Sequence, residues 1–233
     1  MPEVDMLLDG SITEDEIKRA INNFKNGKAS GDDGVLNEYL KSTLNELMPI
    51  YMKLFSIIFD SSKIPENWNS GIIIAIFKNK GSTSDPEFYR DVTLNSYFSK
   101  TFSSILNNRL NIFSDTINLI SGPQAGLRKG FSTTDNVFVL YALITIYFSF
   151  GKKIFFTFVD FESAFDTVWR TGLWQKIQKS KIKGKLFTVT VYIICIRISN
   201  PALNSEKIAL IFLAVILGYG TGKICPHICF PYF

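Results

Sequence analysis

The chain has 233 residues, of which 46% are hydrophobic and 20% charged, so its composition is that of a globular protein with a sizeable core. The formal net charge is +4, but residues 1–40 contain nine acids and four bases, which leaves +9 on the remaining residues. A basic body is compatible with a polyanionic partner. The single histidine, His227, argues against His-based metal centres and Ser-His-Asp triads, and three cysteines are too few to staple a secreted fold.

The N-terminal part of the chain is predicted to be helical. Thr13 followed by Glu16 forms a capping box, and apolar residues then recur at helical spacing until Gly27, where the helix is expected to stop. After a predicted turn at 31–34 (GDDG), apolar residues at helical spacing resume. Pro49 interrupts this second stretch, which predicts either two helices or one kinked helix.

A β-hairpin is predicted next. Residues 71–77 (GIIIAIF) form a short apolar run rich in β-branched side chains, and a second short strand is expected around 91–94. The connecting loop over 78–86 contains two lysines, so the hairpin is expected to carry a basic loop.

Further helices and one buried strand are predicted in the rest of the chain. Residues 97–113 are expected to be helical, and 132–150 form a strongly apolar helix whose part from 137 to 150 is expected in the core. Residues 153–159 (KIFFTFV) predict a buried strand, and 164–180 return to helical spacing. Because helices and strands are mixed without strict βα alternation, the predicted fold class is α+β.

Two apolar stretches, 137–150 and 208–217, raise the question of a membrane. Both are shorter than the ~18 residues that a spanning helix needs. Burial is favoured for the first, whereas an anchoring role of the second is left open. No membrane partner is expected overall.

One acidic residue is placed for metal chemistry. Asp160 directly follows the predicted strand 153–159. Magnesium takes one or two carboxylates and completes its coordination with water and substrate phosphates, so Asp160 is a candidate ligand. The alternative is that Asp160 begins a turn or caps the following helix.

Six blocks of the sequence, in order, carry a resemblance. Residues 160–166 (DFESAFD) resemble the first palm motif of reverse transcriptases, in the form found in non-LTR (LINE, jockey-like) retrotransposons. The upstream blocks resemble the same family: NGKASGDDG at 26–34, Pro65-x-x-Trp68, IFKNKG at 76–81, DPEFYRDVTL at 85–94 and QAGLRKGFST at 124–133.

The resemblance implies an RNA-directed DNA polymerase in the nucleus, acting on deoxynucleoside triphosphates and an RNA or DNA template-primer with Mg²⁺. The implied fold is the fingers and a partial palm of a right-hand polymerase, helix-rich with short antiparallel strands. The implied division is an N-terminal helix and turn at 1–34, fingers at 35–150, a partial palm with the first catalytic motif at 151–187 and an unassigned apolar tail at 188–233.

The resemblance also assigns roles to single residues. Asp160 would be the catalytic metal ligand together with the backbone carbonyl of Phe161, and Phe165 would stack beneath the incoming sugar; the alternative for Phe165 is core packing. Arg90, with Lys78 or Lys80, would grip the triphosphate. The residues expected near template or primer are Arg128, Lys129, Lys176, Lys179, Lys181, Lys183 and Lys185. For each basic residue the alternative is a solvated surface charge.

The match ends near residue 187, and the sequence contains no Tyr-x-Asp-Asp motif, which in this family supplies the other two metal carboxylates. We therefore expect a reverse transcriptase domain truncated before its catalytic centre is complete and inactive alone. The alternative is a non-catalytic nucleic-acid-binding remnant of a mobile element. Asp91, where the family has Gly, is expected to neutralise part of the charge of Arg90. Cys225-x-His227-x-Cys229 has an unusual spacing for zinc and no partner pair.

Overall fold

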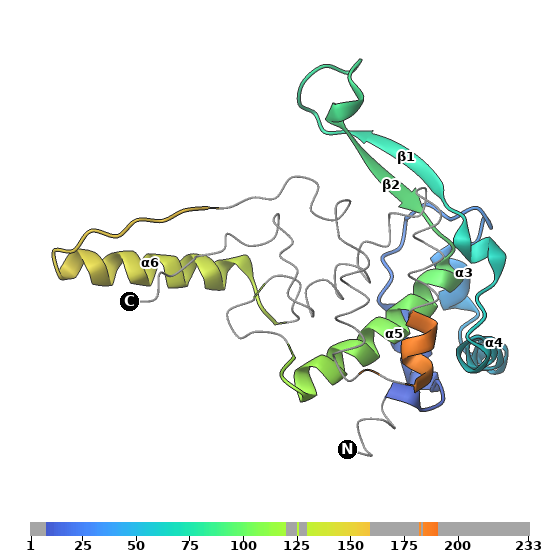
Figure 1. Ribbon diagram of the computed structural model, residues 1–233. Helices are drawn as coiled ribbons and strands as arrows, with labels where there is room; N and C mark the ends of the chain where they lie inside the picture. The colour runs from blue at the N-terminus through green and yellow to red at the C-terminus, as the bar shows by residue number, and fades with distance from the viewer. Residues whose placement is uncertain (1–7, 120–124, 126–129, 159–181, 183, 191–233) are drawn as a thin grey trace.

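The computed structural model describes residues 8–119, 125, 130–158, 182 and 184–190 (Figure 1). The described elements are helices and one small antiparallel two-stranded sheet, which is compatible with the predicted α+β class. The helices are α2 (Glu14–Asn22), α3 (Asn37–Ser42), α4 (Met48–Ser61), α5 (Tyr97–Thr116), α6 (Thr133–Ser149) and a short helix over 184–190. The strands are β1 (Ile72–Phe77) and β2 (Tyr89–Leu94), and the 3₁₀ turns are η1 (Glu66–Asn69) and η2 (Pro86–Phe88).

The capping box and the proline break predicted in the N-terminal half are confirmed, whereas the expected helix stop at Gly27 is wrong, because α2 already ends at Asn22 with Asn23 as its C-cap. The Thr13 side chain accepts from the Glu16 backbone N–H, and the Glu16 side chain accepts in return from the Thr13 backbone N–H, which starts α2. Pro49 lies in the first turn of α4, where its missing N–H is not needed, so the chain forms two helices, α3 and α4. The predicted hairpin and the helix beginning at 97 are also present.

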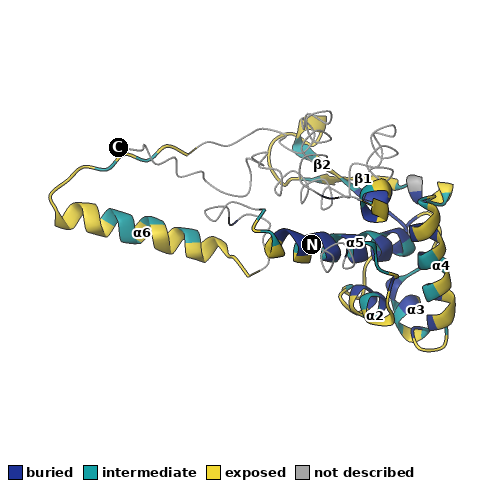
Figure 2. Cartoon of the chain, turned by 60° about the horizontal axis from the view of Figure 1, so that its bottom comes forward, coloured by how far each residue is buried: buried dark blue, intermediate teal, exposed yellow. Residues whose placement is uncertain are grey.

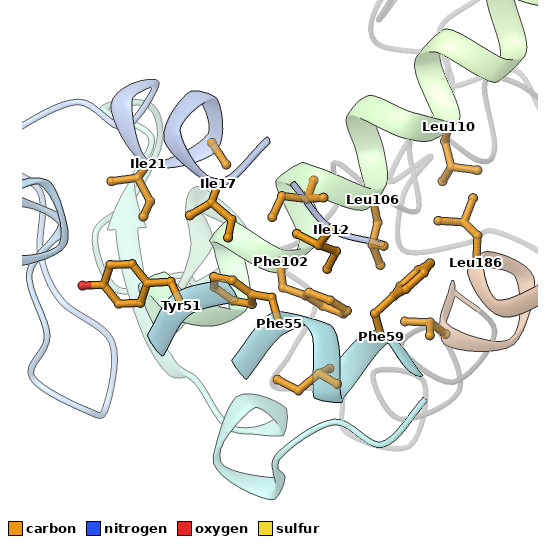
Figure 3. Packing of buried hydrophobic residues seen from close by; sticks show 14 of the residues in the cluster. Ile12, Ile17, Ile21, Tyr51, Phe55, Phe59, Phe102, Leu106, Leu110 and Leu186 are labelled. Atoms are coloured by element: carbon orange, nitrogen blue, oxygen red, sulfur yellow. The ribbon is translucent and has the colours of Figure 1, made fainter. Parts of the chain in front are cut away.

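The core lies where α2, α4, α5 and helix 184–190 meet (Figure 3). Ile17 and Ile21 of α2 pack in one cluster with large aromatic side chains of α4 and α5. Phe55 of α4 stacks on Phe102 of α5 with ring centroids 6.0 Å apart, and Trp68 contacts both rings. Burial of these side chains is the main apolar stabilisation of the body.

A buried ion pair crosses this core. Arg109 of α5 bonds both carboxylate oxygens of Glu16, at 2.6 Å and 2.8 Å, and the two side chains are only 5% and 12% exposed. Arg109 also donates to the carbonyls of Leu8, Gly10 and Ser11, and its guanidinium lies 5.1 Å from the centre of the Phe59 ring. The N-terminal segment is thereby attached to α5.

Helix 184–190 packs onto the same N-terminal segment. The Leu186 backbone N–H donates to the carboxylate of Asp9 at 3.0 Å, and the side chains of Leu186 and Val189 are fully buried. Lys185 pairs with Asp60 of α4 at 2.6 Å. The helix spans the predicted boundary between 187 and 188, and the division into domains stays a prediction.

The expected burial of the apolar helix is wrong. No residue of α6 is buried, and Phe138 and Phe148 are 68% and 71% exposed. Figure 2 shows α6 extending away from the helical body with its surface mostly exposed or intermediate. An apolar composition predicts that a helix prefers burial, but tertiary contacts determine whether a surface covers it.

The buried strand predicted at 153–159 is also wrong for its described part. Residues 153–158 form no strand, and Phe155 is 89% exposed. Val159 and the predicted helix 164–180 lie outside the described residues. Within the described part of the chain, no helix is long and apolar enough to cross a membrane.

Replacing Glu16 by Gln should destabilise the body in a pH-dependent manner. Partial burial acts to raise the pKa of Glu16, but hydrogen bonds from Arg109 and Thr13 hold the pKa below its usual 4.5. Its contribution is therefore complete above about pH 4.5 and is lost as the pH falls through the lowered folded-state pKa. We expect the free energy of unfolding in urea at pH 7 to fall by about 2–4 kcal/mol.

The matched control is Glu14→Gln on the same helix, whose carboxylate makes an exposed pair with Lys18 and should contribute less than about 1 kcal/mol. The difference between the native chain and Glu16→Gln should shrink below pH 4.5. If the difference in unfolding free energy stayed constant down to about pH 3, below the ordinary pKa of a glutamate, the role of the Glu16 charge would be contradicted.

Two Phe→Ala substitutions test the burial difference between α4 and α6. Phe55→Ala, at a position 1% exposed, should lower the free energy of unfolding by about 3–5 kcal/mol. Phe148→Ala, at a position 71% exposed, should change it by less than about 0.5 kcal/mol. Urea unfolding followed by far-UV circular dichroism measures both, and a comparable loss for Phe148→Ala would show that α6 is covered.

Candidate nucleotide-binding hairpin

The β1–β2 hairpin places two of the predicted phosphate-binding residues on one face. Ile76 pairs with Arg90 in the antiparallel register, and the Lys78 backbone N–H donates to the Phe88 carbonyl at 2.8 Å, which extends the same register by two residues. Since side chains alternate between faces along a strand, Lys78 and Arg90 share a face. In Figure 1 this hairpin projects from the helical body.

The same face carries an exposed row of isoleucines. Ile72, Ile74 and Ile76 lie on it by strand alternation, and they are 44%, 42% and 50% exposed. An apolar row that ends beside two cations can contact both the flat, apolar part and the anionic part of one ligand.

Asp91 lies on the other face. It pairs with Ala75, whereas Arg90 pairs with Ile76, and consecutive strand residues alternate. The register therefore argues against the expected neutralisation of Arg90 by Asp91. The hairpin face that carries Lys78 and Arg90 keeps its positive charge.

The hairpin loop is held by its own contacts. The Lys78 ammonium donates to the Glu87 carbonyl at 2.6 Å, and the Asp85 carboxylate accepts from the Glu87 backbone N–H at 3.0 Å. Gly81 has a φ of +80°, and a Cβ there would lie 2.4 Å from the Phe88 ring. Lys78 is thus already engaged, while Lys80 and Arg90 are exposed.

Of the other predicted site residues away from the hairpin, only one lies in the described part of the chain. Lys185 is described, and it forms the ion pair with Asp60. The predicted residues that lie outside the described part are Asp160, Phe161, Phe165, Arg128, Lys129, Lys176, Lys179, Lys181 and Lys183. Among the described residues, no three His, Cys, Asp or Glu side chains gather into a possible metal site.

Sequence reasoning placed Gly31 in a turn and Gly71 at the start of a strand, but it did not predict the contacts that these glycines make at the base of the hairpin. A Cβ on Gly31 would lie 2.6 Å from both the Asn95 carbonyl carbon and the Ser96 nitrogen, and one on Gly71 would lie 2.4 Å from the Asn95 side-chain oxygen. Gly71 precedes β1 and Asn95 follows β2, so the two ends of the hairpin meet at Asn95, and Asn95 also lies against Gly31. The GxDG pattern itself was visible, but its contact partner was not.

Comparisons with known proteins agree on one family. Residues 77–216 match the family described as "Reverse transcriptase (RNA-dependent DNA polymerase)", so the match continues past residue 187, where the motif resemblance was expected to end. The chain is 30% identical over 168 residues to a probable RNA-directed DNA polymerase from transposon BS of Drosophila melanogaster, covering 72% of this chain and 18% of that protein. It is 26% identical over 174 residues to the RNA-directed DNA polymerase from mobile element jockey of the same species, covering 72% of this chain and 18% of that protein.

A third relative is the probable RNA-directed DNA polymerase from transposon X-element of Drosophila melanogaster, 28% identical over 186 residues, covering 75% of this chain and 20% of that protein. The chain thus spans about a fifth of the length of these relatives. With the match over residues 77–216, these similarities show that the chain belongs to the reverse transcriptase family, in the form found in non-LTR, jockey-like retrotransposons.

Proposed function

We propose that this chain contributes the fingers and the first part of the palm to an RNA-directed DNA polymerase, and that the β1–β2 hairpin binds the triphosphate of the incoming deoxynucleotide. The observation that carries the proposal is the shared face of Lys78 and Arg90 beside the exposed isoleucine row. Phosphoryl transfer depends mainly on positioning and charge stabilisation, which such a face can supply.

Arg90 is the main phosphate ligand in this proposal. Its guanidinium can bond two phosphate oxygens at once, which a lysine ammonium cannot match in geometry. Lys80 adds an exposed charge on the loop, and Lys78 would have to exchange its bond to the Glu87 carbonyl for a bond to phosphate. The isoleucine row would contact the sugar or the base.

The palm assignments rest on family membership and on the motif at 160–166. Asp160 and the carbonyl of Phe161 are proposed as metal ligands, with Mg²⁺ as the proposed ion, and Phe165 as the residue beneath the sugar. Template and primer would meet Arg128, Lys129 and the lysine cluster from 176 to 185. The division at 34, 150 and 187 belongs to the same proposal.

The hairpin prediction is tested by triphosphate binding. Arg90→Gln should weaken the binding of a fluorescent deoxynucleoside triphosphate by about tenfold or more, because a charge-assisted bond to phosphate contributes about 1.5–3 kcal/mol. Asp91→Asn, one residue away but on the opposite face, should not weaken binding. Equal affinities of Arg90→Gln and the native chain in a fluorescence titration would refute the assignment.

Primer extension tests the proposed inactivity of the chain alone. With Asp160 as the only carboxylate that it contributes, the full chain should not extend a primer on an RNA template with Mg²⁺, whereas it should bind the template with steep salt dependence. Extension that disappears in Asp160→Asn would contradict this, because other carboxylates would then complete the metal site. Failure to bind template at low salt would contradict the nucleic-acid role.

A further inference from the structure

A loop between α2 and α3 meets the base of the hairpin. Residues 24–34, here called the collar loop, contact the junction between β2 and α5 through Gly31, which is buried. The approach is so close that a Cβ on Gly31 would lie 2.6 Å from two backbone atoms of Asn95 and Ser96. Backbone atoms cannot yield as a flexible side chain can, so this contact requires glycine.

The collar loop is held from its other side by α3. The Glu38 carboxylate accepts from the Gly27 backbone N–H at 2.6 Å, and the fully buried Asn37 donates to the Lys25 carbonyl at 2.9 Å. The Lys41 ammonium donates to the Asn26 side-chain oxygen at 2.7 Å and to the Phe24 carbonyl. Three side chains of one short helix thus hold four consecutive backbone or side-chain groups of the loop.

The start of the collar loop also contacts the start of α5. The ring of Phe24 lies edge-on to that of Tyr97, with centroids 5.2 Å apart, and Tyr97 is the first residue of α5. Ser96 caps the same helix by accepting from the Phe98 backbone N–H. The junction at Asn95 and Ser96 therefore lies between the hairpin, the collar loop and a capped helix.

We propose that the collar loop, braced by Glu38, Asn37 and Lys41, sets the position of the β1–β2 hairpin on the helical body and thereby the position of Arg90. These three side chains and Gly31 are positioning residues, because none of them lies on the hairpin. This inference rests on the proposed function only where it concerns the triphosphate, since the position of the hairpin can be measured without a ligand. Sites that bind by geometry depend on such supporting contacts.

A distance measurement tests the position of the hairpin. Spin labels are attached at exposed Ser84 in the hairpin loop and exposed Lys53 on α4, in the full chain with Cys195, Cys225 and Cys229 replaced by Ser. Gly31→Ala should shift or broaden the distance distribution by several Å. Its Cβ would push the base of the hairpin outward until an ordinary contact distance is restored, and the length of the hairpin enlarges this displacement at the tip. Gly151→Ala is the control: it strains a residue with φ +67° outside the collar loop, and its Cβ would meet nothing within 4 Å.

A second variant avoids a steric insertion. Glu38→Ala releases the Gly27 backbone N–H and should also broaden the distribution, while Glu38→Gln keeps an acceptor and should restore it. An unchanged distribution in both Glu38→Ala and Gly31→Ala, with native far-UV circular dichroism, would overturn the positioning role. A change of equal size in Gly151→Ala would overturn it as well, because that residue lies outside the collar loop and its added Cβ meets no neighbour.

Triphosphate affinity separates this inference from the proposed function. If the distance shifts in Gly31→Ala and the same variant binds the triphosphate about tenfold more weakly, as expected for loss of a charged phosphate contact, the positioning role and the proposed function are both supported. If the distance shifts and an Arg90→Gln control leaves affinity unchanged, the positioning holds and the proposed binding role of the hairpin fails.

Discussion

Arg109 connects the N-terminal segment to the helical core through one guanidinium. Its five hydrogen bonds, two to the Glu16 carboxylate and three to backbone carbonyls, use its full set of N–H donors. A charge this deeply buried is tolerated only when it is paired and its donors are satisfied. Since Glu16 is also the residue that completes the cap of α2, the same carboxylate starts the helix and attaches it to α5.

The rest of the body depends on that attachment. The segment that Arg109 holds contributes Leu8 and Ile12 to the core, each 1% exposed. It also places the Asp9 carboxylate where it accepts from the backbone N–H of Leu186. Loss of the ion pair would therefore loosen the start of α2 and the surface on which helix 184–190 packs. The packing of the apolar cluster in Figure 3 therefore depends in part on the ion pair between Arg109 and Glu16.

Local signals in the sequence were sufficient for several elements and insufficient for the contacts between them. The cap at Thr13 and Glu16, the break at Pro49 and the hairpin each depend on residues close together in the chain, and the structure has all three. Arg109 is separated from Glu16 by 93 residues and Asp9 from Leu186 by 177, so no periodicity links them. The close approach of Gly31 to Asn95 is likewise a tertiary contact, and a GxDG pattern alone indicates only a turn.

A comparison of α6 with the hairpin shows why apolar residues alone misled the prediction that α6 is buried. Both elements are rich in Ile, Val or Phe, and both are exposed, yet their charges differ in arrangement. In the hairpin, alternation assigns Arg90 to one face and Asp91 to the other, so the isoleucine row lies next to cations. In α6 the only charged residue is Asp135, and its carboxylate accepts a hydrogen bond within the helix cap. No cation on α6 therefore favours an anion. An exposed apolar surface acquires a specific partner through the charges beside it, which is why the hairpin, and not α6, is the element proposed to bind a nucleotide.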